Sequence, residues 1–448
     1  MLIKNYRDII ANGANDEIKR KRKDALEIIE AAVKAVDPYQ SVKEIITNNS
    51  IAVNEKVIDP SCFNHVYVIG FGKASVDMAR AIIDSMHVDK GVIISNDHIS
   101  ASKLHGTPIE VYIGGHPIPN QGSLTGTERI ISLINKTTAR DLVIVLISGG
   151  GSSLLCKPRI SLKSMQRITE MLWKTGADIK EVNTIRKHLS YVKGGKLARM
   201  NKGTMISLII SDIIGDPLEF IASAPTYPDT TTFNDAKRIC EHYNLWEKLP
   251  SDARSVIKKG LEGVIPDNPR PDDPVFNHVH HMIIASNTDA CLAAKKKSEE
   301  LGYEARIIPT PITGEAKRAG LNLLLTVKDL SKNSMDKTVV IGGGETTVNV
   351  KGDGVGGRNH ELVLSCVGEL SKTKWVLTSF ATDGIDGNSD SAGAIADQYT
   401  LPRALRLNLN PEEFLTNNNS YTFFQYLNDA LITGKTGTNV MDIQLVII

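Results

Sequence analysis

The sequence predicts an α/β protein made of two three-layer α/β/α domains, the N-terminal one Rossmann-like. From residue 66 onward, short apolar runs alternate with segments of helical periodicity, which is typical of α/β folds. A stretch rich in Pro and Asp, residues 262–279, has no such periodicity and separates two series of strands and helices. We therefore expect an N-terminal domain over residues 1–265 and a C-terminal domain over residues 266–448.

The expected elements follow the apolar pattern. A helix over residues 26–36 stops at Asp37-Pro38, and we expect it to pack on the first domain. Apolar runs predict strands and helical spacing predicts helices in both domains. The expected strands are 66–69, 92–94, 109–113, 142–147 and 205–210, then 282–285, 305–308, 338–341, 375–379 and 443–448, with helices at 289–301 and 360–370.

Charge and composition exclude several classes of protein. The 52 Lys and Arg residues nearly balance the 51 Asp and Glu residues, so no net field would attract nucleic acid or an anionic membrane. The five cysteines are scattered without a C-x-x-C pair, which argues against a disulfide framework and a zinc site. Residues 1–8 carry charges where a signal peptide would need its apolar stretch, so we expect none, and no apolar run approaches ~18 residues. We expect a cytoplasmic protein that binds small molecules.

Two glycine loops in the first half are candidates for anion binding. In the first, Gly70-Phe71-Gly72-Lys73 joins a strand to a helix whose N-terminal N–H groups favour an anion, and Lys73 adds a positive charge. A tight turn with a solvated Lys73 is an equally good interpretation of this motif alone. The second loop is the stronger signal, because its glycines can form a nest of N–H groups and its serines add hydroxyl donors; a plain flexible loop is the alternative. Its residues are Ser148, Gly149, Gly150, Gly151, Ser152 and Ser153.

Further along, clustered donors and loop carboxylates suggest substrate and metal binding. Residues 183–188, which include Arg186, and residues 193–196 could clamp an acidic substrate, although a solvated helix face explains them equally well. Asp212 and Asp216 follow a strand and could bind Mg²⁺ or accept a proton, or could form ordinary caps and turns. Asp383, in another loop after a strand, has the same alternatives.

The second half repeats the arrangement of a strand followed by glycines. Gly342-Gly343-Gly344-Glu345 follows the strand expected at 338–341, and a second glycine-rich stretch places Arg358 at the start of a helix. A guanidinium on such a platform suits bidentate binding of phosphate or carboxylate, whereas a structural ion pair is the alternative. Glycine loops, cations and loop carboxylates in both halves favour phosphoryl transfer, in which positioning and charge neutralisation dominate.

The ordered series of loops resembles the glycerate 2-kinase family, once often named hydroxypyruvate reductase. The resemblance runs from Gly70 almost to the C-terminus and rests on many short motifs. These are Gly70 to Ala74, Gly115 to Pro119, Ser148 to Ser152, Asn183 to Leu189, Ser211-Asp212, Gly215 to Pro217, Gly342 to Thr347, Gly356 to Asn359, Thr382 to Gly384, Asp386-Gly387 and Thr436 to Asn439. Ala224, Ala381 and His360 depart from the Gly, Gly and Gln of the family pattern.

The resemblance implies an ATP- and Mg²⁺-dependent kinase with its active site in an interdomain cleft. Such an enzyme would phosphorylate D-glycerate at its C2 hydroxyl to give 2-phospho-D-glycerate and ADP. It implies importance for Lys73 and Arg358, which with Arg186 would bind substrate. The loops at Ser148 to Ser152 and at Gly343, Gly344 and Glu345 would hold ATP. Asp212, Asp216 and Asp383 are the metal candidates, and a homodimer is left open.

Two other functions stay open at this level. An NAD(P)H-dependent hydroxypyruvate reductase is supported by Gly70-x-Gly72 and by Asp97, which lies where an acid could bind ribose. Lys73 inside the loop and the missing third glycine count against it. A non-catalytic protein that binds phosphorylated metabolites could use the same loops, and only turnover would separate it from a kinase.

Overall fold

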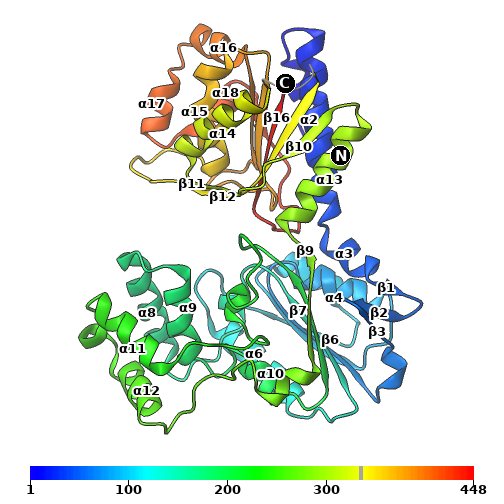
Figure 1. Cartoon of the computed structure of the whole chain (residues 1–448), viewed down its shortest axis with the longest axis vertical. Helices are drawn as coiled ribbons and strands as arrows, with labels where there is room; N and C mark the ends of the chain where they lie inside the picture. Colours follow the sequence, from blue (N-terminus) through cyan, green and yellow to red (C-terminus); the bar gives the residue numbers. More distant parts are fainter. Residues whose placement is uncertain (332–336) are drawn as a thin grey trace. The chain divides into compact units, whose positions relative to one another are not determined.

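The computed structural model describes residues 1–331 and 337–448, which form two compact units (Figure 1). The inserted unit comprises residues 38–284. The split unit combines residues 1–37 with residues 285–448. Each unit contains a β-sheet with helices on both faces, so the predicted α/β class is confirmed.

The inserted unit has a six-stranded sheet in the order β6-β5-β4-β7-β8-β9. In chain order this is 3-2-1-4-5-6, the strand order of Rossmann folds, so the Rossmann-like prediction is confirmed. The pairs β4–β5, β4–β7, β5–β6 and β7–β8 are parallel. The strands are β4 (Val66–Phe71), β5 (Lys90–Ser95), β6 (Ile109–Ile113), β7 (Leu142–Ile147), β8 (Thr204–Ile210) and β9 (Val279–Ala285).

The central strand β7 shows why this sheet forms. Its six residues, Leu-Val-Ile-Val-Leu-Ile, are all buried, as expected for a parallel strand covered on both faces. Helices α4 and α6 pack on β5, and a separate group made of α8, α9, α11 and α12 has its own apolar core. The helices are α3 (Pro38–Glu44), α4 (Ser75–Ile83), α5 (His98–Ala101), α6 (Gln121–Ile134), α7 (Gly151–Leu154), α8 (Leu162–Thr175), α9 (Ile179–His188), α10 (Lys196–Met200), α11 (Phe233–His242) and α12 (Ser251–Leu261). A small antiparallel sheet joins β1 (Ile46–Thr47), β2 (Ser50–Val53) and β3 (Lys56–Ile58).

The split unit has a mixed sheet in the order β10-β12-β16-β13-β14-β15, with β11 also paired to β12. The C-terminal strand β16 lies antiparallel between β12 and β13, as its apolar sequence predicts for a buried strand. The strands are β10 (Glu304–Ile307), β11 (Ile312–Glu315), β12 (Thr338–Thr347), β13 (Val376–Ala381), β14 (Gly393–Asp397), β15 (Ala430–Leu431) and β16 (Asp442–Ile447).

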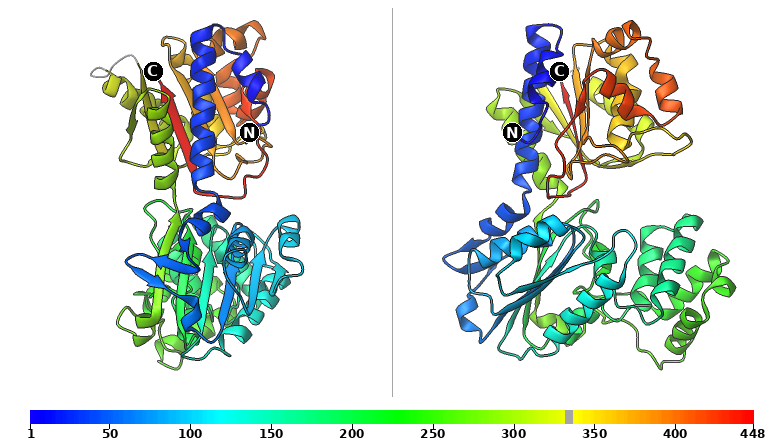
Figure 2. Two further views of the ribbon diagram at one scale, coloured as in Figure 1. Left: turned by 90° about the vertical axis from the view of Figure 1, so that its right-hand side faces the viewer. Right: turned by 180° about the vertical axis from the view of Figure 1, so that it is seen from behind.

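Helices cover the split sheet on two sides. Helices α2 and α13 contact each other and the sheet, and Figure 2 shows the blue α2 beside the red β16. Helices α14 and α15 contact each other and the sheet, and α17 and α18 pack on α15. The helices are α1 (Tyr6–Ala11), α2 (Asp16–Ala35), α13 (Asn287–Glu300), α14 (Ala316–Ser331), α15 (Arg358–Leu370), α16 (Thr400–Arg406), α17 (Pro411–Thr416) and α18 (Ser420–Tyr426).

The two units differ from the predicted domains in two respects. First, α2 belongs to the split unit and not to the first domain, because its buried Arg22 pairs with Asp397 at 2.7 Å and with Asp429 at 2.6 Å. Second, β9 completes the inserted sheet, so the chain leaves that unit after residue 284 and not at residue 265. Within the described ranges, none of the helices has the length and apolar character needed to cross a membrane.

Candidate functional site

The carboxyl edge of the inserted sheet gathers three of the predicted loops. Phe71 pairs with Ile147, and Ile147 pairs with Ile209, so the chain segments that follow β4, β7 and β8 leave the sheet side by side. These segments carry Lys73, the Ser148–Ser152 loop and Asp212. In Rossmann-like sheets the first and fourth strands flank the switch point where ligands bind. The strand order therefore puts Lys73 and the Ser148 loop at the site that the fold itself favours.

The first two loops are hydrogen-bonded to each other. The N–H of Ala74 donates to Ser148 Oγ at 3.0 Å, and the N–H of Lys73 donates to the carbonyl of Gly149 at 2.9 Å. Ser148 is buried, and its hydroxyl binds the backbone of Ala74, the residue immediately before α4. The sequence predicted that the N–H groups at the start of this helix would bind an anion. Two of them, those of Lys73 and Ala74, instead donate to the neighbouring loop, and Ser148 thereby fixes the position of the Lys73 loop.

Gly150 and Ser152 are the half-buried residues of the second loop, whereas Gly151 and Ser153 are buried. Gly150 has φ of 84°, a conformation that favours glycine, and a Cβ there would lie 3.0 Å from His116 Cδ2. Burial lowers the pKa of His116, and the positive charge of Lys73 lowers it further. The neutral imidazole of His116 therefore lies within the electrostatic reach of Lys73, next to the glycine loop.

Ser152 begins a chain of hydrogen bonds that the sequence did not suggest. Its hydroxyl lies 2.9 Å from Ser223 Oγ, which donates to Asn183 Oδ1 at 2.7 Å. Asn183 belongs to α9, and Ser223 belongs to a turn in which residues 222–224 all have positive φ. Ala224, which stands where the family pattern has glycine, has φ of 54° in this turn. The strained turn is held against the Ser152 loop by this polar chain.

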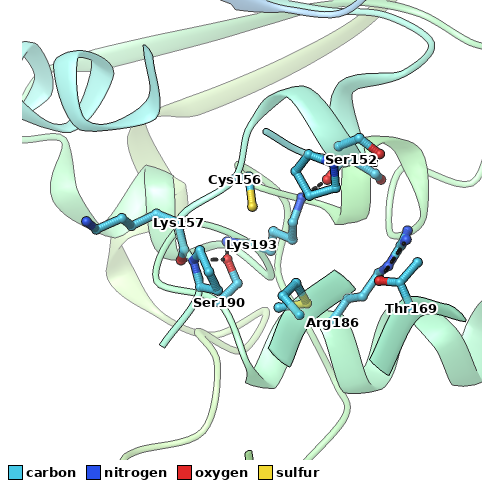
Figure 3. A pocket seen from close by; sticks show the side chains of 11 residues that line it. Ser152, Cys156, Lys157, Thr169, Arg186, Ser190 and Lys193 are labelled. Atoms are coloured by element: carbon cyan, nitrogen blue, oxygen red, sulfur yellow. Dashed lines mark hydrogen bonds between the residues drawn. The ribbon is translucent and has the colours of Figure 1, made fainter. Parts of the chain in front are cut away.

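A narrow pocket opens beside Ser152, between the loop after β7 and helix α9 (Figure 3). Arg186 projects from α9, and its Nη2 lies 3.5 Å from Thr169 Oγ1. Lys193 is 4% exposed, and its amine donates to the carbonyl of Ser152 at 2.7 Å. Burial lowers the pKa of Lys193 to about 7. Two cationic groups thus face one small space from two different segments.

In the split unit, Arg358 is held by two carboxylates. Its Nε and Nη2 donate to Asp442 at 2.6 and 3.0 Å, and its Nη1 lies 2.6 Å from Glu345 Oε1. Asp442 is fully buried, whereas the Glu345 side chain is 44% exposed. Burial raises the pKa of Asp442 to about 7 against the opposing charge of Arg358. Arg358 is therefore in an ion pair in this structure, as the alternative interpretation of the sequence expected. The sequence did not indicate that Asp442 would be its buried partner.

The expected glycine nest at Gly342 to Glu345 is not a loop, which corrects that part of the prediction. These residues continue β12 to Thr347, and Gly342, Gly343 and Gly344 pair with β16. The glycines are needed for close packing, since a Cβ on Gly343 would lie 1.8 Å from Asn287 Oδ1. The backbone of Gly343 and Gly344 belongs to the sheet ladder, and only Glu345 presents a side chain at this edge.

The first turn of α15 is anchored by Asp386. Its carboxylate accepts hydrogen bonds from the N–H groups of Asn359 at 3.1 Å and His360 at 2.9 Å. The His360 ring also lies against Asp386 and places Nε2 3.1 Å from Ser391 Oγ. Asp386 is thus a helix cap, which keeps Arg358 at the start of α15.

The three metal candidates lie in different units. Asp212 follows β8, and Asp216 occupies a turn with φ of 55°. Asp383 lies two residues beyond Ala381, the residue of β13 that pairs with Asp442. The Oδ1 of Asp383 accepts a hydrogen bond from the N–H of Ile385 at 3.1 Å. Over residues 1–331 and 337–448, the structure has no group of three or more His, Cys, Asp or Glu side chains arranged to hold a metal ion.

The fold and these sites define an α/β protein with cationic side chains near the strand ends of both units. Comparisons with known proteins narrow the class. Residues 24–258 match a family described as a domain of unknown function, DUF4147, and residues 338–442 match the MOFRL family. The chain is 41% identical to glycerate 2-kinase of Pyrococcus horikoshii, covering 95% of this chain and 97% of that protein.

Two further comparisons agree. The chain is 35% identical to D-glycerate 2-kinase of Thermotoga maritima, covering 94% of this chain and 97% of that one. The crystal structure of glycerate kinase from Thermotoga maritima superposes with a TM-score of 0.84 at 34% identity, covering 95% and 99% of the two chains. The chain belongs to the glycerate kinase family.

Proposed function

We propose that the protein is an ATP-dependent kinase that phosphorylates D-glycerate at the C2 hydroxyl, releasing 2-phospho-D-glycerate and ADP. The observation that carries this proposal is the similarity to glycerate 2-kinases over nearly the whole length of the chain. The chemistry of the strand ends agrees with it, because cations and carboxylates are the groups that phosphoryl transfer requires. A cytosolic location and a homodimer belong to the same proposal.

Lys73 is proposed to contact the acid or the transferring phosphoryl group. Its loop is fixed at both ends by the hydrogen bonds to Ser148 and Gly149, so its position is set before substrate arrives. Gly149, Gly150, Gly151 and Ser152 are proposed to approach ATP. Since Ser148 Oγ accepts the N–H of Ala74, its proposed role becomes support of the Lys73 loop.

Arg358 is proposed to bind an anionic oxygen through Nη1. Asp442 holds Nε and Nη2 from the buried side, which fixes the plane of the guanidinium. Glu345 covers Nη1 from the exposed side, so an incoming phosphate or carboxylate would replace the Glu345 carboxylate. Glu345 is then released as one candidate for accepting the hydroxyl proton, together with Asp212, Asp216 and Asp383.

Mg²⁺ is proposed as the metal, and the oxygen donors present suit it. Magnesium in kinase sites is usually held by one or two carboxylates together with substrate phosphates, so a cluster of three protein ligands is not required. The candidate ligands are Asp212 and Asp216 in the inserted unit and, as a separate alternative, Asp383 in the split unit. When bound, the ion would neutralise negative charge on the transferring phosphoryl group.

The reductase alternative has one observation in its favour, the Rossmann strand order. Two contacts oppose it. Asp97 uses its carboxylate to cap α5, accepting from the N–H of Ile99 at 3.0 Å and from Ser100 Oγ at 2.9 Å. The N–H of Ala74, just before the start of α4 where a pyrophosphate would bind, already donates to Ser148 Oγ.

The deciding experiment is incubation of the purified protein with D-glycerate, ATP and Mg²⁺, followed by NMR of the products. A parallel assay follows NADH absorbance with hydroxypyruvate. Formation of 2-phosphoglycerate would establish both the reaction and the position of the phosphate. NADH oxidation without a phosphorylated product would refute the kinase and support the reductase. Ligand-induced thermal stabilisation with no product in either assay would support a binding protein.

A further inference from the structure

The pocket beside Ser152 combines positive charge with burial. Its walls come from the segment before α6, the chain around α7, helices α8 and α9, and the turn that carries Lys193. The lining contains Arg186, Lys193 and Lys157, and among the described residues that line it there is no carboxylate. The lining residues are Pro119, Ser152, Ser153, Cys156, Lys157, Pro158, Met165, Thr169, Arg186, Ser190 and Lys193.

Burial of cations without a carboxylate partner is costly unless an anion joins them. Arg186 is half-buried and has only the Thr169 hydroxyl as a hydrogen-bond partner within the described chain, while Lys193 bonds a neutral carbonyl. Lys157 differs from both, because it reaches out to Glu128 and is one-third exposed. The uncompensated charge in the pocket therefore comes from Arg186 and Lys193.

The size and the walls of the pocket select a small ligand. The cavity volume of the pocket is about 20 Å³, little more than the space of one water molecule, so it admits a single small polar group. Pro119, Cys156 and Met165 give it apolar walls, while hydroxyl groups of Ser152, Thr169 and Ser190 line it as well. Such a space can take one carboxylate group, with the rest of a small acid outside it, and a nucleotide base would not fit.

We propose that this pocket is the carboxylate subsite of the acceptor acid, in which Arg186 and Lys193 neutralise the carboxylate of glycerate. This inference rests on the proposed function and adds the location of one substrate group within the inserted unit. Ser152 joins the pocket to the glycine loop after β7, so an acid held here extends from the favoured edge of the sheet. The phosphate oxygens of ATP share the same anionic chemistry, and the test separates the two.

The test compares Lys193→Met with Lys157→Met as the matched control. Titration calorimetry without any second substrate measures the affinity for D-glycerate and, separately, for a non-hydrolysable ATP analogue. We expect Lys193→Met to weaken glycerate binding at least tenfold, as loss of a charge-assisted hydrogen bond does, and to change nucleotide affinity less than twofold. Lys157→Met should change neither. Where glycerate alone binds the wild type too weakly to titrate, KM for glycerate replaces the dissociation constant.

Each result has a distinct meaning. Weakened nucleotide binding with intact glycerate binding would overturn the assignment in favour of a phosphate subsite, and unchanged binding of both would overturn it entirely. Glycerate binding that depends on Lys193 in a protein that makes no phosphorylated product would refute the kinase and leave the pocket assignment intact. Circular dichroism checks folding, and Arg186→Met provides a second variant with the same expected loss.

The wild type offers a further test that needs no variant. The titratable groups facing Lys193 in the pocket are Cys156, whose pKa is raised by burial, Arg186 and Lys157, so Lys193 is the one expected to change charge near neutral pH. A carboxylate bound in the pocket favours the charged form of Lys193. Affinity for glycerate should therefore be constant below about pH 7 and fall up to tenfold per unit above it. A flat profile between about pH 6 and 9 would overturn the proposal.

Discussion

The two carboxylates that hold Arg358 should contribute very differently to stability. Asp442→Asn leaves the guanidinium facing a fully buried neutral group, and breaking a buried pair costs about 3–5 kcal/mol. Glu345→Gln removes a partner that is 44% exposed, and pairs of that kind contribute about 0–1 kcal/mol. At the lower limit of 3 kcal/mol, a unit of this size should melt about 6–12 °C lower in Asp442→Asn. Glu345→Gln should melt within about 3 °C of the wild type.

The measurement is urea unfolding at pH 8, above the pKa of Asp442, combined with hydrogen exchange of peptides from α15 and β16. Because the two units can unfold separately, the exchange data assign the loss to the split unit. Equal destabilisation by both substitutions, or a loss below about 1 kcal/mol for Asp442→Asn, would refute the reasoning. The same variants separate stability from activity, since Glu345→Gln uncovers Nη1 and should leave the fold intact.

Three further outcomes are expected. Lys73→Ala and Arg358→Ala should each lower kcat/KM for glycerate at least about 100-fold, the usual loss for a charge-stabilising group, and turnover at the wild-type level in both would contradict their roles. Gly150→Ala should destabilise the inserted unit by about 1–2 kcal/mol in thermal unfolding, since φ of 84° is strained for alanine; an unchanged melting temperature would contradict this. Burial lowers the pKa of His281 to about 4, below its value in the unfolded chain. The contribution of the neutral His281 ring to the free energy of unfolding is therefore present above about pH 6.5 and is lost as the pH falls to 4. That loss should reach about 2 kcal/mol, allowing for partial exposure, and His281→Gln should flatten the stability profile measured from pH 7 to 4.

The strands of the inserted unit could be predicted because each carries its own signal. The runs at 66–69, 92–94, 109–113, 142–147 and 205–210 are all strands, since uninterrupted Val, Ile and Leu favour a buried parallel sheet. The unit boundaries could not be predicted in the same way. The place of α2 depends on Arg22 meeting Asp397 and Asp429, and no local pattern connects residues so distant in sequence.

Glycine-rich stretches predicted the loops of the candidate site less reliably than apolar runs predicted the strands. The loop after β7 lies where predicted, but Ser148 supports α4 because β4 and β7 are neighbours, which requires the strand order. Gly342 to Gly344 belong to a strand because Asn287 and β11 approach closely, and sequence does not distinguish that use of glycine from a loop. Asp442 could have been noticed as the single charged residue opening the terminal apolar run.

The connection of α2 to the far end of the chain has a consequence for biosynthesis. The two carboxylates that neutralise Arg22 lie 375 and 407 residues downstream. At translation rates of about 5–20 residues per second, roughly 20–80 seconds pass between synthesis of α2 and synthesis of these two carboxylates. The whole inserted unit is synthesised in that interval. A nascent chain thus carries α2 without its carboxylate partners while the inserted unit has already been synthesised.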